Sequence, residues 1–251
     1  MALYVSELNS AAEQRRPSVV LAHGFTQNSR CWSSFSTELA QTRRLKLVDL
    51  PGHGQSEHDD ADLVTSGDLL AEAGGEAAIV GYSMGGRIAL HTALQYRSQV
   101  SKLILIGVNP GLEAASDREQ RRTNDTELAL QLRREGLDVF LRKWLHNPMF
   151  GGLSEEAACL KHRLVNRLSG LEATLLTRSV GCQVPLWERL GELTMPVLLI
   201  SGQADQKYGL LNERAAGLIP QAQTCTIPGG HAVHLQNPKA VAAAVNQFIG
   251  G

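Results

Sequence analysis

Residues 81–86 read Gly-Tyr-Ser-Met-Gly-Gly, a Gly-x-Ser-x-Gly pattern set between two different kinds of sequence. The apolar run 77–80 precedes it, and a segment with helical apolar periodicity, 88–94, follows it. Strand, tight turn and helix in this order are typical of a nucleophile elbow, whose flanking glycines let strand and helix approach closely. The pattern therefore predicts that Ser83 sits in a strained turn at the carboxyl end of a buried strand.

Further runs of strand length, apolar or rich in β-type residues, occur on both sides of the elbow, and each ends in turn-forming residues. They are residues 19–22, 45–48, 102–106, 196–200 and 222–227. Helical patterns lie between or after them, for example at 28–40 and 239–248. Because strands alternate with helices, the sequence predicts an α/β fold with a mainly parallel, doubly wound sheet.

The alternation breaks between residue 111 and about residue 190. This stretch carries helical patterns at 126–134 and 137–144, but no convincing strand. An insertion at the carboxyl ends of parallel strands would cover the place where such sheets bind ligands. We therefore expect a core of residues 1–111 and 191–251, with a helical cap inserted at 112–190.

Composition narrows the class of protein. The 251 residues and net charge of −1 suit one globular domain, and give no sign of nucleic-acid binding. No stretch approaches the ~20 apolar residues of a membrane span, and no signal peptide is evident, so we expect a cytoplasmic protein without membrane insertion. The cysteines form no C-x-x-C pair, which argues against a zinc site or a disulfide framework. They are Cys31, Cys159, Cys182 and Cys225. Composition leaves the oligomeric state open.

A serine needs an imidazole to accept its proton, and the imidazole needs an acid to orient it. Ser83, Asp205 and His231 occur in the chain order expected of this fold, and each follows a predicted strand. His234 is an alternative to His231. We favour His231 because it directly follows two glycines in a strand-end loop, whereas His234 looks like the start of a helix.

Two other polar residues near strand ends are interpreted as structural. Asp49 ends the second apolar run but precedes the serine, and His53 lies between two glycines in a turn-rich segment. An oxyanion formed next to Ser83 would need two backbone N–H donors. We predict that Met84, the residue after the nucleophile, and Phe25, in the loop after the first run, provide them.

Several motifs resemble a known family. His23-Gly24-Phe25, the run Asp-Leu-Pro-Gly-His-Gly-Gln-Ser at 49–56, and the elbow resemble the α/β-hydrolase superfamily. A narrower resemblance, over nearly the whole chain, is to 2-succinyl-6-hydroxy-2,4-cyclohexadiene-1-carboxylate (SHCHC) synthases, the MenH family. It is carried by an arginine after the elbow and by the motifs at 109–112, 120–125, 144–150 and 205–208.

The resemblance implies a lyase of menaquinone biosynthesis on an α/β-hydrolase fold. Such enzymes eliminate pyruvate from 2-succinyl-5-enolpyruvyl-6-hydroxy-3-cyclohexene-1-carboxylate, and need no metal or organic cofactor. By this resemblance Ser83, activated by His231 and Asp205, would remove a ring proton next to a ketone. The partner would be a small polycarboxylate substrate.

The resemblance also implies a set of substrate-binding residues, because arginine forks bind carboxylates in two-pronged fashion. The set is Tyr82, Arg87, Arg121, Trp144, Arg167 and Lys207. Arg163 competes with Arg167, since the sequence around them aligns loosely. Lys207 could contact the substrate or only support Asp205.

Two other functions compete with the lyase. A carboxylesterase or carbon–carbon hydrolase would use the same three catalytic residues without needing the arginines. A noncatalytic small-molecule receptor on the same fold is the third reading. Fold alone does not decide between them.

Overall fold

The computed structural model of the chain describes residues 2–8, 18–151 and 153–250, so the predicted core segment 9–17 lies outside the described residues. The described strands form one sheet in the order β1-β3-β2-β4-β5-β6-β7. Their bounds are β1 (Val5–Leu8), β2 (Ser18–Ala22), β3 (Leu45–Val48), β4 (Ala77–Tyr82), β5 (Val100–Ile106), β6 (Val197–Gly202) and β7 (Ala222–Ile227).

All neighbouring strands from β3 to β7 run parallel, which confirms the predicted mainly parallel sheet. The exception is β1, which pairs antiparallel with β3, with Val5 opposite Val48 and Leu8 opposite Leu45. β1 is not among the strands that the sequence predicts. Its residues Val-Ser-Glu-Leu are only partly buried because it is an edge strand, so it carries no apolar run.

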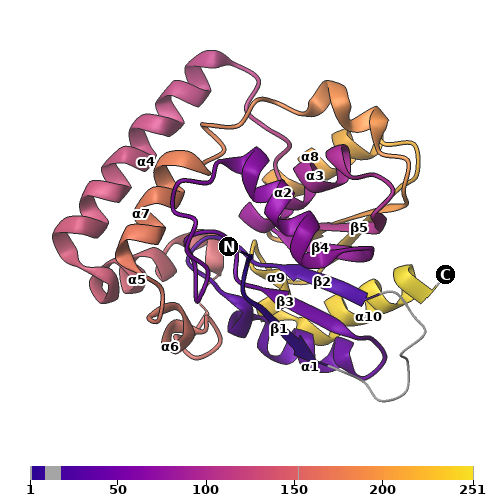
Figure 1. Cartoon of the computed structure of the whole chain (residues 1–251), viewed down its shortest axis with the longest axis horizontal. Coiled ribbons are helices and arrows are strands. Elements are labelled where there is room, and N and C mark those ends of the chain that lie inside the picture. The colour runs from indigo at the N-terminus through magenta and orange to yellow at the C-terminus, as the bar shows by residue number, and fades with distance from the viewer. Residues whose placement is uncertain (1, 9–17, 152, 251) are drawn as a thin grey trace.

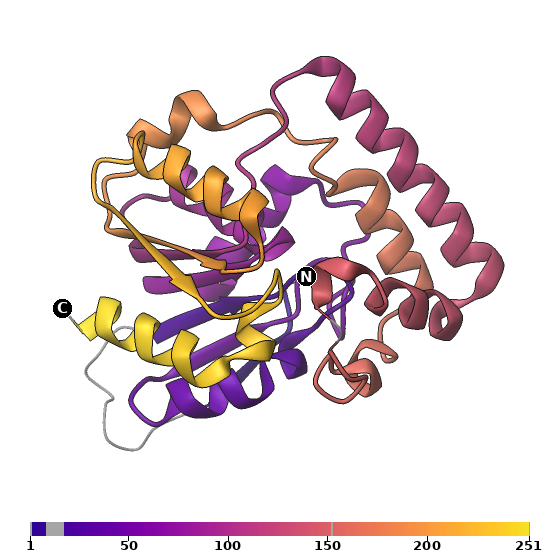
Figure 2. The ribbon, with the colours of Figure 1, turned by 180° about the vertical axis from the view of Figure 1, so that it is seen from behind.

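Helices cover both faces of the sheet (Figures 1 and 2). One face is covered by α2 (Leu63–Gly74), α3 (Met84–Gln95) and α8 (Gln206–Ala216), and the other by η1 (Ser29–Trp32), α1 (Ser33–Ala40), α9 (Val233–Gln236) and α10 (Pro238–Gly250). Alternate residues of a strand point to opposite faces of the sheet and so pack into two different apolar clusters. Ile79 of β4 packs with α3 on one face, whereas Val80 packs with α1 and α10 on the other. Strands buried on both faces explain the continuous apolar runs in the sequence.

Four helices form a separate layer at one side of the molecule, in rose to orange in Figures 1 and 2. They are α4 (Ala115–Glu135), α5 (Leu137–Leu145), α6 (Leu160–Arg163) and α7 (Leu168–Thr177), with the short η2 (Pro148–Phe150) between α5 and α6. We call this layer the cap. It has its own small apolar cluster, in which Leu132, Phe140 and Leu171 are buried. The structure thus contains the inserted helical layer that the sequence predicted.

The cap leaves the core and returns to it at nearly the same place. The backbone N–H of Leu186 donates to the Pro110 carbonyl at 2.9 Å, and the Trp187 indole donates to the Gly111 carbonyl at 2.8 Å. The segment η3 (Trp187–Glu192) then packs with the core cluster. The boundaries 111/112 and 190/191 remain predictions. None of the described helices is both long and apolar enough to span a membrane.

Candidate active site

The sharp turn between β4 and α3 gives Ser83 its position. Its backbone has φ 50° and ψ −110°, a conformation that a residue with a side chain rarely adopts. A Cβ on Gly81 would lie 2.5 Å from the Cα of Gly86, and one on Gly85 would collide with the backbone of Ala22. Both elbow glycines are therefore required by close approach of strand, turn and helix.

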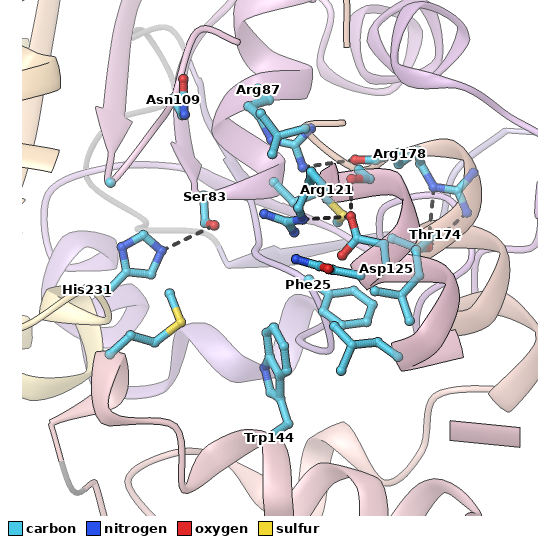
Figure 3. A pocket seen from close by; sticks show the side chains of 18 of the residues that line it. Phe25, Ser83, Arg87, Asn109, Arg121, Asp125, Trp144, Thr174, Arg178 and His231 are labelled. Carbon is cyan, nitrogen blue, oxygen red and sulfur yellow. Dashed lines mark hydrogen bonds and ion pairs between the residues drawn. The ribbon is translucent and has the colours of Figure 1, made fainter. Parts of the chain in front are cut away.

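Ser83, His231 and Asp205 lie in hydrogen-bond series. His231 Nδ1 is 2.8 Å from Asp205 Oδ2, and His231 Nε2 is 3.3 Å from Ser83 Oγ (Figure 3). Asp205 directly precedes α8 and His231 lies between β7 and α9, so both are held at the carboxyl ends of strands. The arrangement has the geometry of a serine hydroxyl next to a histidine that a carboxylate orients.

His234, the alternative to His231, has no hydrogen bond to Ser83 among the described residues. Its ring is 4.1 Å from the Tyr82 ring, and its Nε2 is 3.3 Å from Gln27 Nε2. Burial lowers the pKa of His234 well below its usual value, so the ring stays neutral. The structure thus brings His231, and not His234, to the serine.

Phe25 and Met84 are the predicted backbone donors to an oxyanion. Both line the same cavity as Ser83 and His231. Met84 is the first residue of α3, where a helix leaves its N–H groups without intrahelical acceptors. Neither amide has an acceptor within the part of the chain that the structure describes. The two N–H groups are available to an oxygen bound next to Ser83.

The loop that carries Phe25 is held by the cap. The guanidinium of Arg163, at the end of α6, donates to Thr26 Oγ1 and, at 3.4 Å, to the Phe25 carbonyl. Asn166 Nδ2 donates to the Thr26 carbonyl at 2.6 Å. The backbone next to the oxyanion position is therefore fixed by side chains more than a hundred residues away in sequence.

Between the strand ends and the cap lies a cavity of about 350 Å³. Figure 3 shows Ser83 and His231 on one side, Arg87 and Arg121 above, and Trp144 and Phe25 on the opposite wall. The Trp144 and Phe25 rings meet edge to face, with centroids 5.3 Å apart. A small ligand would thus meet apolar rings on one side and guanidinium groups on the other.

Arg87 and Arg121 make one end of the cavity positive. Arg87 is only 8% exposed, and burial, with Arg121 nearby, lowers its pKa to about 10, so it is still charged at neutral pH. Arg87 Nη2 donates to the Arg178 carbonyl at 2.9 Å, and Arg121 Nε donates to Asp125 Oδ2 at 2.7 Å. These bonds fix the guanidinium groups and leave further donors for an anion.

Two predicted contacts on the core are corrected. Tyr82 is the last residue of β4 and faces the core, 4% exposed, with its ring 5.4 Å from that of His231. Lys207 is exposed beside Tyr208 and does not line the cavity. Successive residues of a helix point in different directions, so Tyr208, and not Lys207, faces the site.

A third predicted contact, Arg167, is also corrected. Its guanidinium pairs with Asp59 at 2.7 Å on the surface, and it does not line the cavity. Its competitor Arg163 does not line the cavity either, because it is 1% exposed and bonded to the Thr26 loop. Both guanidinium groups find acceptors at the junction between cap and core, a tertiary arrangement that local spacing does not reveal.

Several polar residues of the cavity wall are not among those that the sequence predicts. The Tyr208 ring packs against the His231 ring, with centroids 4.5 Å apart and planes tilted by 40°, and Asp125 receives hydrogen bonds from both Arg121 and Ser179. Both Tyr208 and Asp125 lie within the motifs at 205–208 and 120–125, and membership of these motifs is the feature of the sequence that could have pointed to them. Arg178 also borders the cavity, but its guanidinium is turned toward Thr174, away from Ser83 (Figure 3).

Asp49 is structural, as predicted. Its carboxylate accepts the backbone N–H groups of Ser29 at 2.7 Å and Gln55 at 2.8 Å, which ties two loops together. His53 is buried and bonded to the Pro51 carbonyl at 2.9 Å, also as a turn residue. Among the described residues, no group of three His, Cys, Asp or Glu side chains is arranged to hold a metal ion.

Comparison with known proteins agrees with this geometry. Residues 19–244 match the model of the alpha/beta hydrolase family. SHCHC synthases of Serratia proteamaculans and of Enterobacter sp. strain 638 are 34% and 33% identical to the chain. The Serratia alignment covers 94% of both chains, and the Enterobacter alignment covers 93% of this chain and 92% of the relative.

Comparison with solved structures also finds similar proteins. MenH from S. aureus superposes with a TM-score of 0.89 at 27% identity, covering 98% of this chain and 97% of that one. An esterase from Exiguobacterium antarcticum, with a TM-score of 0.81 at 20% identity, shares the fold alone. The family match over most of the chain, and relatives above 30% identity over more than nine tenths of it, lead to one conclusion. The chain belongs to the α/β-hydrolase family and, within it, to the SHCHC synthases.

Proposed function

We propose that this chain catalyses elimination of pyruvate from 2-succinyl-5-enolpyruvyl-6-hydroxy-3-cyclohexene-1-carboxylate, giving SHCHC. The observation that carries the proposal is a serine–histidine–aspartate series and two fixed guanidinium groups in one cavity. The names of the relatives support the same reaction. The substrate is a small polyanion, which suits a cavity with a positive end.

Ser83 acts as the base in this proposal. His231 takes the hydroxyl proton of Ser83, and Asp205 holds the imidazole in the orientation that exposes Nε2 to the serine. The Ser83 oxygen then removes the ring proton next to the succinyl ketone. The 3.3 Å separation of Ser83 Oγ and His231 Nε2 is within the range of catalytic pairs that tighten when substrate binds.

The electrons of the broken C–H bond pass onto the ketone oxygen, which becomes an enolate. The N–H groups of Phe25 and Met84 donate to that oxygen and stabilise its charge. When the ketone re-forms, the ring gains its second double bond and the carbon–oxygen bond to the enolpyruvyl group breaks. Enolpyruvate leaves and takes up a proton to become pyruvate. The scheme uses no metal or organic cofactor.

The arginines bind and orient the carboxylates. Arg87 and Arg121 come from different layers, so a bound polycarboxylate would bridge the core and the cap. Trp144 and Phe25 would pack against the ring and exclude water from the reacting atoms. We also propose residues 112–190 as the segment that closes over the substrate.

The test measures pyruvate release from the enolpyruvyl cyclohexene carboxylate by purified protein, with hydrolysis of a p-nitrophenyl ester measured in parallel. Fast pyruvate release with feeble ester cleavage, both lost in Ser83→Ala, is the expected result. Brisk ester cleavage without pyruvate would overturn the proposal and leave a hydrolase. No turnover of either compound would point to a binding protein.

A further inference from the structure

Two cysteines, Cys31 and Cys159, lie against each other where the cap meets the core. Cys31 belongs to η1 on the core, and Cys159 directly precedes α6 in the cap. The Cys159 sulfur is 3.6 Å from the Cys31 carbonyl oxygen and 3.2 Å from Ser33 Oγ. The contact joins segments that are 128 residues apart in the chain.

The surroundings make the two thiols unequal. The pKa of Cys159 is lowered because the Cys31 and Ser33 side chains hydrogen-bond to it and Arg163 lies nearby, although burial opposes the shift. Burial raises the pKa of Cys31 well above its usual value. Cys159 therefore holds the thiolate more readily, and Cys31 remains the protonated neighbour.

Cys159 can be reached without passing through the catalytic cavity. It lines a second cavity of about 490 Å³, together with Trp32, Ser33, His162 and others. None of the described residues that line this cavity also lines the catalytic one. Trp32 Nε1 is buried there without a hydrogen-bond partner among the described residues. A small polar molecule entering this cavity would meet the Cys159 sulfur and an unused donor.

We propose that Cys159 and Cys31 are a modification site, at which hydrogen peroxide oxidises the pair to a disulfide between cap and core. The Cys159 thiolate attacks one peroxide oxygen, the O–O bond breaks and hydroxide leaves, so Cys159 becomes a sulfenic acid. The Cys31 sulfur then attacks the Cys159 sulfur. The S–S bond forms, the S–O bond breaks, and the Cys31 proton leaves with the hydroxyl group as water. The peroxide is reduced by the two electrons that the thiols lose.

The bond would act on the segment that holds the oxyanion loop. Cys159 precedes α6, whose last residue, Arg163, binds Thr26 and the Phe25 carbonyl. A disulfide at Cys159 would fix α6 to η1 and close a long loop of chain. Loop closure lowers the entropy of the unfolded chain, so the oxidised protein should melt at a higher temperature.

The test treats the purified protein with a small excess of hydrogen peroxide at neutral pH, blocks free thiols with N-ethylmaleimide in denaturant and maps the peptides by mass spectrometry. We expect a linked Cys31–Cys159 peptide, reversed by dithiothreitol, and a raised melting temperature. Cys182 is exposed and Cys225 half-buried, so both serve as internal reference thiols.

The variants separate the two sulfurs. Cys31→Ser should stop the reaction at Cys159 sulfenic acid, which a dimedone probe captures, and Cys159→Ser should leave Cys31 unmodified. Cys182→Ser is the matched control and should form the linked peptide as the unmodified chain does. Recovery of Cys159 as the free thiol while Cys182 is oxidised would overturn the proposal. So would a Cys159 disulfide to any cysteine other than Cys31.

Discussion

Arg87 combines burial and charge at the level of a single residue. Its guanidinium is almost fully buried, yet it is bonded to the Arg178 carbonyl at 2.9 Å and to Gln183 Oε1 at 3.3 Å, both neutral acceptors. No carboxylate is bonded to it among the described residues. A buried cation without a bonded anion is costly unless an anion arrives with the substrate. The residue is therefore suited to bind a carboxylate.

Arg87→Ala should lower kcat/KM for pyruvate release by ~100-fold or more, because a charge-assisted fork to a substrate carboxylate is lost. Cleavage of a neutral p-nitrophenyl ester should change little. Steady-state kinetics with both compounds measure the difference. The control is Arg97→Ala, which removes an exposed ion pair with Glu192 and a hydrogen bond to the Glu192 carbonyl, and should leave both activities within about twofold. Equal losses on both compounds would contradict a carboxylate-binding role for Arg87.

Tyr208 and Lys207 give a second residue-scale prediction. The Tyr208 hydroxyl has no hydrogen-bond partner in the described part of the chain, and its ring lines the cavity against His231. Tyr208→Phe should raise KM roughly tenfold by removing one hydrogen bond to the anion, with kcat nearly unchanged. Lys207→Ala should leave KM within about twofold, because the side chain is exposed and does not line the cavity, with its ammonium 5.8 Å from the centre of the Tyr208 ring. A larger rise of KM in the lysine variant than in the tyrosine variant would contradict this prediction and favour Lys207 as the substrate contact.

Some site residues could be predicted from the sequence and others could not, for a physical reason. Ser83, Asp205 and His231 each follow a strand, and the ends of parallel strands meet whatever the loops do. Arg163, Arg167 and Lys207 instead lie on short cap segments or a helix start, where side-chain direction depends on tertiary packing. Spacing therefore gave these three residues the wrong surroundings or no decision. Tyr82 differs, because it lies at a strand end as expected but its side chain is buried in the core.

At the scale of elements, the oxyanion loop depends on the cap. The loop after β2 receives hydrogen bonds from Arg163 and Asn166, and the Asn28 side chain donates back to the His162 carbonyl at 2.6 Å. Arg163→Met keeps the apolar stem of the side chain but removes these donors. It should lower kcat roughly 10- to 100-fold, with KM little changed, because the Phe25 N–H loses its fixed position.

The control for this prediction is Arg167→Met, four residues away, which removes the surface pair with Asp59 and an exposed hydrogen bond to Ser169 Oγ. It should leave kcat and KM within about twofold. Circular dichroism on both variants would establish that each is folded. A loss of activity in the Arg167 variant that equals the loss in the Arg163 variant would refute the positioning role of Arg163.

Elements with strong periodicity were predicted from the sequence, and elements without it were missed. The buried strands and α5 follow from apolar patterns, whereas β1 has no apolar run. α4 begins eleven residues before the predicted start, at Ala115 and not at residue 126. Within it only Asp125, Ala129 and Leu132 are buried, so most of the helix has no apolar face to detect.

At the scale of the whole molecule, burial of neutral histidines links stability to pH. Burial lowers the pKa of His23 and of His91 to about 4, and those of His53 and His234 well below 6.5. In the unfolded chain these rings titrate near pH 6.5. The unfolded state therefore binds more protons below pH 6.5. The contribution of these neutral histidines to the free energy of unfolding is fully present above that pH. It is lost progressively as the pH falls toward 4.

We expect the melting temperature to fall by at least ~5 °C between pH 7 and pH 5, since each histidine costs about 1.4 kcal/mol per pH unit in this window. Calorimetry across the range measures it. His91→Gln should make the melting temperature less dependent on pH, because one buried histidine that takes up a proton on unfolding is removed. The exposed His146→Gln should show the same pH dependence as the unmodified chain. A melting temperature that is flat down to pH 5 would rule out this linkage.

The hydrogen bonds from Arg163 and Asn166 to the Thr26 loop also bear on protein engineering. A cap exchanged between family members brings its own partners for this loop, and the recipient core supplies the acceptors. Chimeras that keep the donors and acceptors from one parent should retain turnover, whereas mixed pairs should fold with a displaced oxyanion loop. Cap and core would therefore be inherited together, and recombination crossovers that preserve function should fall outside the span from Thr26 to Asn166.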